Sequence, residues 1–188
     1  TSDAFFYKPE DFKINPLEEL LKECKNIIDR IGGRIFLGTF PSEVRPESVT
    51  KENIELVLKY CSNDNIIIGA QSGSDKLLSS IKRSHTVNDV KKATKIVLDH
   101  GLKANVDFIF GLPDEKEDDR FLTEKLIEDL VSMGAKIHAH TFIPLPSTPY
   151  WTKKNIDLNI DGEDYLFLLI NVRQVKKITH ILNVYTDD

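Results

Sequence analysis

The sequence is short of cysteine and of long apolar runs. It contains only two cysteines, Cys24 and Cys61, so a disulfide framework is excluded and a cytoplasmic location is expected. Two thiolates also cannot hold an iron–sulfur cluster, which takes three or four. Apolar runs reach about six residues, far short of the ~20 that cross a bilayer, and no signal peptide is evident. These absences predict a protein without a membrane span.

An excess of positive charge is also lacking. The chain has 25 Lys and Arg against 30 Asp and Glu, which gives a formal net charge of −5. Nothing in this balance favours general binding to nucleic-acid phosphates. The 188 residues, 40% of them hydrophobic, are typical of one soluble globular domain with a core of its own.

Strands and helices alternate along the chain. Strands are expected to begin near residues 34, 65, 104 and 137, and a further strand is indicated at residues 4–7. Helices are predicted at 16–31, 50–60, 75–82, 86–100, a stretch ending at Met133, and 163–183. This order indicates right-handed βαβ units and a parallel sheet. The apolar runs at 65–70 and 105–110 suggest strands buried on both faces. No glycine-rich dinucleotide or P-loop motif follows any strand.

Polar residues gather at the predicted carboxyl ends of the strands, where parallel α/β folds place their sites. These residues are Glu43, Arg45, Gln71, Ser72, Ser74, Asp75, Asp107, His138 and His140. They supply carboxylates, amides and hydroxyls, but no Ser–His–acid spacing and no evident nucleophile. The set favours holding a polar small molecule over attacking one.

Each of these residues also has a structural interpretation. A lone carboxylate at Asp107 is costly to bury unpaired, so it either bonds a ligand or pairs with a backbone or Arg partner. Glu43 and Arg45 could equally form a loop ion pair. His138 and His140 share a strand face and could both ligate a metal, although no third ligand has a helpful spacing.

Three motifs, in order, resemble those of radical S-adenosylmethionine (SAM) enzymes. The first is Gly-Ala-Gln-Ser-Gly-Ser-Asp at 69–75, followed by Arg-Ser-His-Thr at 83–86. The second is Val-Asp-Phe-Ile-Phe-Gly-Leu-Pro at 106–113, and the third is His-Thr-Phe-Ile-Pro-Leu-Pro-Ser-Thr-Pro at 140–149. Asp114 and Ser147 stand where the family usually has Gly. The resemblance covers about residues 2–150 and is closest to methylthiotransferases, oxygen-independent coproporphyrinogen oxidases and radical SAM proteins with a cobalamin-binding domain.

The resemblance implies a fold and a cofactor. The implied fold is α/β, a partial (β/α) barrel of the TIM type with a parallel sheet, in which SAM lies across the strand ends. In such enzymes a 4Fe–4S cluster reduces SAM to methionine and a 5′-deoxyadenosyl radical. The implied cofactor-binding residues are Glu43 and Arg83 for the methionine amino and carboxylate ends, Gln71 and Asp107 for ribose hydroxyls, Phe142 and Ile143 for adenine through their backbone, and Ser72 for ribose or substrate.

The Cys-x-x-x-Cys-x-x-Cys motif of this family is absent. We therefore expect residues 1–152 to form the C-terminal part of a radical SAM barrel that lacks the first strand and the cluster loop, with 153–188 as a linker and covering helix. The cluster, and an upstream cobalamin domain, would lie outside this chain, which alone would be inactive. The substrate is not indicated.

Two alternative functions and one mode of self-association stay open. The chain could be a degenerate SAM-fold scaffold module without catalysis. It could also be a (β/α)-barrel metal hydrolase that uses His138, His140 and Asp107. An incomplete barrel exposes a strand edge, so a homodimer is expected through that edge or through the helix at 163–183.

Overall fold

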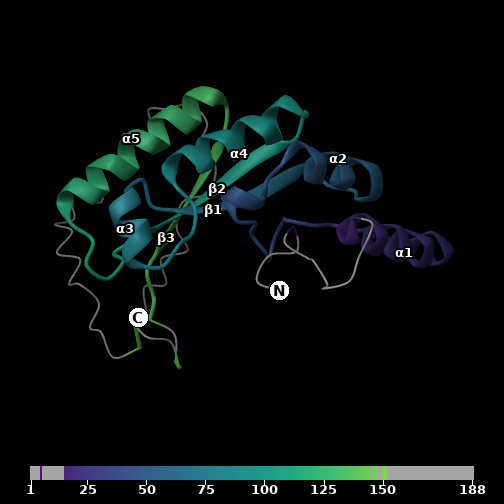
Figure 1. The fold of residues 1–188 in the computed structure, drawn as a ribbon, viewed down its shortest axis with the longest axis horizontal. Coiled ribbons are helices and arrows are strands. Elements are labelled where there is room, and N and C mark those ends of the chain that lie inside the picture. The colour runs from purple at the N-terminus through teal and green to yellow at the C-terminus, as the bar shows by residue number, and fades with distance from the viewer. Residues whose placement is uncertain (1–4, 6–14, 145, 148–149, 152–188) are drawn as a thin grey trace, which may run out of the picture. The chain divides into compact units, whose positions relative to one another are not determined.

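A computed structural model describes residue 5 and residues 15–144, 146–147 and 150–151. The helices are α1 (Pro16–Ile31), α2 (Lys51–Tyr60), α3 (Asp75–Ser80), α4 (Val87–Asp99) and α5 (Glu117–Met133), with a 3-10 helix at Pro46–Ser48. The strands are β1 (Asn65–Gln71), β2 (Lys103–Phe110) and β3 (Lys136–Thr141) (Figure 1). The predicted strand at 4–7, apart from Phe5, and the predicted helix at 163–183 lie outside the described residues. Within these residues, no helix combines the length and the apolar character needed to span a bilayer.

The chain divides into two compact units. The first contains Thr1–Ala70 and Asn88–Val106, and the second contains Gln71–Val87 and Asp107–Asp188. The strands form one parallel sheet in the order β1-β2-β3, which is not closed. The predicted α/β architecture with a partial barrel-like parallel sheet is confirmed.

Most helix boundaries follow the local signals in the sequence. The side chain of Asn15 accepts a hydrogen bond from the backbone of Leu17 at 3.1 Å, and Pro16 opens α1. Gly32, at φ 72°, ends α1 in the left-handed conformation. Thr50 caps α2 by accepting from the backbone of Asn53 at 3.1 Å. These predicted helices are therefore confirmed at their ends.

The apolar stripe of α1 is only partly buried. Leu17 and Leu21 are buried, whereas Leu20, Ile27 and Ile31 are exposed. The first turn is tied to α2 because Glu18 accepts hydrogen bonds from Lys59 at 2.8 Å and from the Tyr60 hydroxyl at 3.0 Å. The helix predicted at 16–31 is confirmed, but its apolar residues are not all buried.

The strands differ in how they are buried. In β1, every residue after Asn65 is buried, as predicted. In β2, the residues Ala104, Val106, Phe108 and Phe110 are buried, and the alternate residues Asn105, Asp107 and Ile109 are only half-buried. The prediction that β2 is buried on both faces is wrong. Its second face carries polar side chains, including the Asp107 carboxylate.

The strand predicted at 34–40 does not form. Gly38 has φ 68°, which breaks an extended backbone. The segment still lies along β1, because Ile67 N donates to Gly38 O at 2.8 Å and Val44 forms a parallel bridge with Ile68. The side chain of Asn63 replaces part of a strand ladder: it accepts from Leu37 N at 3.1 Å and donates to Leu37 O at 2.8 Å.

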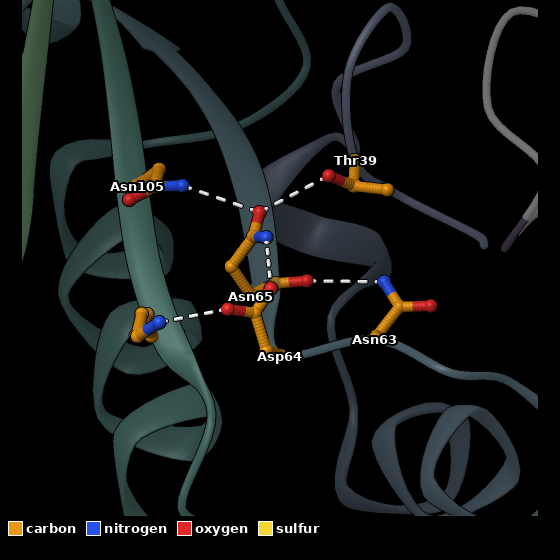
Figure 2. Close-up of polar contacts among 6 residues, drawn as sticks. Thr39, Asn63, Asp64, Asn65 and Asn105 are labelled. Carbon is orange, nitrogen blue, oxygen red and sulfur yellow. Dashed lines mark hydrogen bonds and ion pairs between the residues drawn. The ribbon is translucent and has the colours of Figure 1, made fainter.

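A group of polar side chains closes the amino ends of β1 and β2. Figure 2 shows Thr39 and Asn105 approaching the Asn65 side chain from opposite sides, and both donate to its Oδ1, at 3.1 and 3.2 Å. The Asn65 amide donates in turn to Asp64 at 2.6 Å, and Asp64 also accepts from Lys103 at 2.7 Å. Internal hydrogen bonds occupy this end of the strands. A ligand site is therefore expected at the opposite, carboxyl ends.

The Asn63 clamp gives a test of this part of the fold. Asn63→Ala removes both bonds to Leu37 and the bond to Asn65 O (3.0 Å). Loss of a part-buried polar clamp is expected to lower the free energy of unfolding by about 1–3 kcal/mol, measured by urea denaturation. Ser62→Ala is the matched control, since Ser62 is exposed and its backbone bond to Ile35 O persists. Equal stability of the two variants would contradict the clamp.

Candidate functional site

The loop after β1 is fixed by a buried hydrogen-bond network. Gln71 ends β1 with φ 66° and is only 4% exposed. Ser72 is fully buried, and its hydroxyl lies 3.3 Å from the Thr123 hydroxyl of α5 and accepts from Ser74 N at 3.1 Å. The Ser74 hydroxyl donates to Asp119 at 2.5 Å. The serines of the motif therefore face α5, and they hold the backbone that carries Gln71.

Gly73 lies directly against α5. Its backbone N–H donates to the Thr123 hydroxyl at 2.9 Å. A Cβ at this position would lie 2.5 Å from Leu122 O and 2.5 Å from Thr123 Cα. Both are main-chain atoms and cannot turn aside, so only glycine fits here.

Arg83 is held in the second unit by the turn that follows α3. Its backbone N–H donates to Leu78 O at 2.9 Å, and Asp75 accepts from Val87 N at 2.7 Å across the same turn. The Arg83 side chain is half-buried. The backbone N–H groups of Arg83 and of Val87, the residue directly after the motif, therefore anchor residues 83–86.

The carboxylate of Asp107, on β2, is paired with two histidines of β3. His138 Nδ1 lies 3.0 Å from Oδ1, and His140 Nε2 lies 3.8 Å from Oδ2. Burial by itself raises the pKa of Asp107, but the His138 hydrogen bond and the nearby His138 and His140 charges outweigh it and hold the pKa below its usual range. Asp107 is a carboxylate at neutral pH and can only accept hydrogen bonds. Its partners are histidines rather than the backbone or Arg partner considered above.

The loop after β2 closes on a second buried carboxylate. Glu115 Oε2 accepts from Gly111 N at 2.7 Å and lies 3.9 Å from Arg120 Nε. Its other oxygen, Oε1, has no hydrogen-bond partner among the described residues. Burial raises the pKa of Glu115 above 4.5, although the bond from Gly111 and the Arg120 charge oppose the shift.

Phe142 and Ile143 continue from β3. Phe142 N donates to Phe110 O at 2.8 Å, so the backbone pairing with β2 extends past the end of the strand. The Phe142 ring is half-buried and packs edge-on against Tyr150, with ring centroids 6.0 Å apart. Ile143 is 71% exposed. The backbone at Phe142 is thus still paired with β2, whereas the next side chain, Ile143, is exposed to solvent.

The second unit contains six of the seven predicted residues: Gln71, Ser72, Arg83, Asp107, Phe142 and Ile143. Glu43, half-buried, belongs to the first unit, and its role rests on motif position alone. The ion pair that the structure gives Arg45 is with Glu47, at 3.2 Å. The sequence left His138 and His140 open as metal ligands together with Asp107 and did not predict their direct pairing with that carboxylate. Asp107 and His138 each stand between apolar neighbours, but no spacing in the sequence contains the register that joins them.

Neither a metal ion nor an iron–sulfur cluster fits the side chains that the structure describes. No group of three or more His, Cys, Asp or Glu among them is placed to hold a metal ion, so the metal-hydrolase alternative gains no support. The chain has two thiols, and burial, with Cys24 adding to it, raises the pKa of Cys61 to about 11. A protonated, half-buried thiol is a poor ligand.

Gly73 provides a test of the contact with α5. Gly73→Ala is expected to lower the free energy of unfolding by about 1–3 kcal/mol or more, because main-chain atoms must shift. Gly33→Ala is the matched control, since its Cβ would meet side-chain atoms, of Ile28 at 3.2 Å and of Ile31 at 3.9 Å, and no main-chain atom is among its nearest contacts. Thermal and urea unfolding measure both. A Gly73→Ala protein as stable as the control would show that the loop is not pressed on α5.

Glu115 gives a pH dependence with a defined sign. Its pKa is above 4.5 in the fold, so the folded state binds the proton more tightly than the unfolded state. The Glu115 contribution is fully present below pH 4.5 and is lost as pH rises through the raised pKa. Glu115→Gln should flatten that decline in stability, measured by urea unfolding from pH 4 to 8, whereas the exposed Glu128→Gln should not. Parallel pH profiles for wild type and Glu115→Gln would refute this assignment.

Comparison with known proteins identifies the family. The model of the radical SAM superfamily matches residues 6–127. An uncharacterized protein of Methanocaldococcus jannaschii is 31% identical over 157 residues, which cover 79% of this chain and 30% of that protein. The tRNA-2-methylthio-N(6)-dimethylallyladenosine synthase of Thermosipho africanus is 26% identical over 174 residues, or 86% of this chain and 37% of the enzyme.

A solved structure agrees in fold. Coproporphyrinogen III oxidase from Escherichia coli, a radical SAM enzyme, superposes with a TM-score of 0.60 at 15% identity, over 81% of this chain and 37% of the oxidase. The chain thus spans about a third of the length of the proteins it matches. The family resemblance that the motifs predicted is confirmed, and the chain belongs to the radical SAM superfamily.

Proposed function

We propose that this chain binds S-adenosylmethionine at the carboxyl ends of its strands and forms the SAM-binding part of a longer radical SAM enzyme. Membership of the superfamily supports SAM as the ligand class. The distribution of hydrogen bonds supports the location. The amino ends of β1 and β2 are occupied by internal contacts of asparagine side chains. Gln71 and Phe142 lie at the carboxyl ends of β1 and β3, and Asp107 lies in the carboxyl half of β2.

The observation that carries the proposal is the ionised carboxylate of Asp107. It lies on a strand whose other face is fully buried, and only 16% of its side chain is exposed. Burying a charge in this way costs free energy unless partners repay it. The hydrogen bond between His138 and Oδ1 offsets part of that cost. Neither histidine lies within hydrogen-bond distance of Oδ2. A carboxylate oxygen of this kind suits a ribose hydroxyl, which is a donor.

The remaining residues take the roles that their motif positions imply. The Gln71 amide, fixed at the end of β1, bonds a ribose hydroxyl, and the Arg83 guanidinium pairs with the methionine carboxylate. The backbone at Phe142 and Ile143 meets the adenine, and Glu43 accepts from the methionine ammonium. We assign Ser72 a supporting role, since its hydroxyl already contacts Thr123 and Ser74.

The cluster that gives this superfamily its radical chemistry does not fit the two thiols of this chain. We propose that a different segment of the parent protein ligates it, so that residues 1–188 alone bind SAM but do not cleave it. A cobalamin domain in that protein stays a prediction from the family resemblance. The rival function, a scaffold module, predicts no SAM binding at all.

Asp107→Asn tests the proposal. The substitution keeps the size and the acceptor facing His138 but replaces the charged acceptor Oδ2 with a donor. SAM affinity, measured by calorimetry, is expected to fall about tenfold or more, because a hydrogen bond to a charged group contributes about 1.5–3 kcal/mol. Asp118→Asn is the matched control, since Asp118 is exposed on α5.

Two outcomes would contradict the proposal. One is a wild-type chain that shows no SAM binding at millimolar ligand, alone and as part of the longer protein, which would favour the scaffold function. The other is SAM cleavage by the 188-residue chain without any cluster, which would show that the division of labour proposed here is wrong.

A further inference from the structure

Helix α1 carries an apolar row that stays exposed in the part of the chain that the structure describes. Leu17 and Leu21 of this helix are buried, whereas Leu20, Ile27 and Ile31 are 41%, 60% and 72% exposed. The three exposed residues recur at intervals of seven and four, so they fall within about 40° of one another around the helix axis. We call these three residues the outer row. A contiguous apolar surface of this kind is typical of an interaction site.

The outer row has the spacing with which two helices pack side by side. Alternate steps of three and four residues connect the apolar residues Leu17, Leu20, Cys24, Ile27 and Ile31. Leu17 is already buried within the chain, and Cys24 is half-buried at the border of the row. The outer row therefore offers a second helix about 16 Å of apolar surface along the axis.

Two opposite charges border the outer row on the side away from the buried stripe. Glu23 and Arg30 are both exposed and point in directions only about 20° apart around the axis. They are seven residues, or about 10 Å, apart along α1, so they cannot pair with each other within one helix. The ion pairs that α1 makes with described residues use other charges, Lys25 with Asp29 and Lys59 with Glu18.

A second copy of α1 fits the outer row in the antiparallel orientation. A two-fold axis midway between residues 25 and 26 places Leu20 against the partner's Ile31 and Ile27 against the partner's Cys24. The same axis repeats both contacts in reverse, because a two-fold interface uses one surface of each copy. Every residue of the outer row then meets an apolar side chain or a thiol.

The bordering charges agree with the antiparallel orientation. It places Glu23 beside the partner's Arg30, and the symmetry gives this contact twice. Parallel packing of the same rows would instead place Glu23 beside the partner's Ile28, and no opposite charges would meet. Charges that flank an apolar seam set the relative orientation of two helices in this way.

We propose that the outer row of α1 is a homodimer interface, in which two copies of this chain pack α1 against α1 in the antiparallel orientation and Glu23 pairs with the partner's Arg30. This surface differs from the two that the sequence suggested, the strand edge and the helix predicted at 163–183. It also does not depend on SAM binding, because it shares no residue with the proposed SAM site. One short helix buries less than a standard interface, so we expect a dissociation constant on the order of 10 μM.

Sedimentation equilibrium of the 188-residue chain under reducing conditions tests the interface. Ile27→Asp places a carboxylate at the centre of the apolar contact and is expected to weaken dimerisation at least about tenfold. Asn26→Asp is the matched control, since it introduces the same charge at the adjacent exposed position, off the row. Its dissociation constant should stay within about threefold of wild type.

Charge reversal tests the orientation. Arg30→Glu and Glu23→Arg should each weaken dimerisation about tenfold, because two like-charge contacts replace two ion pairs. The double variant Glu23→Arg/Arg30→Glu restores both pairs and should return to within about threefold of wild type. Lys22→Glu is the control for net charge, since Lys22 is exposed on another side of α1. All these positions are exposed, so this arm stands even if Ile27→Asp does not fold.

Four results would contradict the inference. A wild-type chain that stays monomeric up to about 300 μM has no such interface. A dimer that Ile27→Asp leaves intact forms elsewhere, at the strand edge or at residues 163–183. Failure of the double reversal to restore dimerisation would exclude the antiparallel pairing. A longer parent protein that is monomeric while this chain dimerises would show that another of its segments, and not a second copy, covers the outer row.

Discussion

A single buried charge constrains this part of the protein more than any other interaction. Asp107 is ionised within a strand whose alternate residues, Val106 and Phe108, are completely buried. Water is too scarce there to solvate the carboxylate fully, so a neighbouring strand must supply donors. The register of β3 against β2 is therefore tied to His138, since a slip of one residue would turn both histidines to the opposite face and leave the charge unpaired.

The loops around this charge are held by main-chain contacts rather than by apolar packing alone. Gly73 N donates to Thr123, Gly111 N donates to Glu115, and Phe142 N donates to Phe110. Each bond fixes a segment that follows a strand, and two of the three use a side chain from α5 or from the turn before it. Helix α5 is therefore a support for the strand-end loops, and its buried polar residues Asp119 and Thr123 serve that purpose.

The sequence predicted what is local and missed what joins distant residues. The boundaries of α1 and α2 followed from Asn15, Gly32 and Thr50, because a cap acts within one helical turn. The pairing of Asp107 with His138 joins residues 31 positions apart, and no spacing rule contains the register that brings them together. The strand predicted at 34–40 does not form, because Gly38 has a positive φ and the Asn63 side chain bonds the backbone of Leu37. In β2, the polar residues Lys103, Asn105 and Asp107 alternate with apolar ones. The apolar run that follows Asp107 nevertheless favoured a strand buried on both faces.

The close approach of Gly73 to α5 changes how the Ser-Gly-Ser motif of this superfamily is best interpreted. In this chain the glycine is demanded by two main-chain atoms of a helix, and the serine hydroxyls bond inward. Any chain that keeps this helix packing needs the glycine, whether or not it binds a nucleoside. Its presence in a sequence is therefore evidence for a fold. Evidence for a ligand has to come from side chains outside this contact with α5, such as the ionised carboxylate of Asp107.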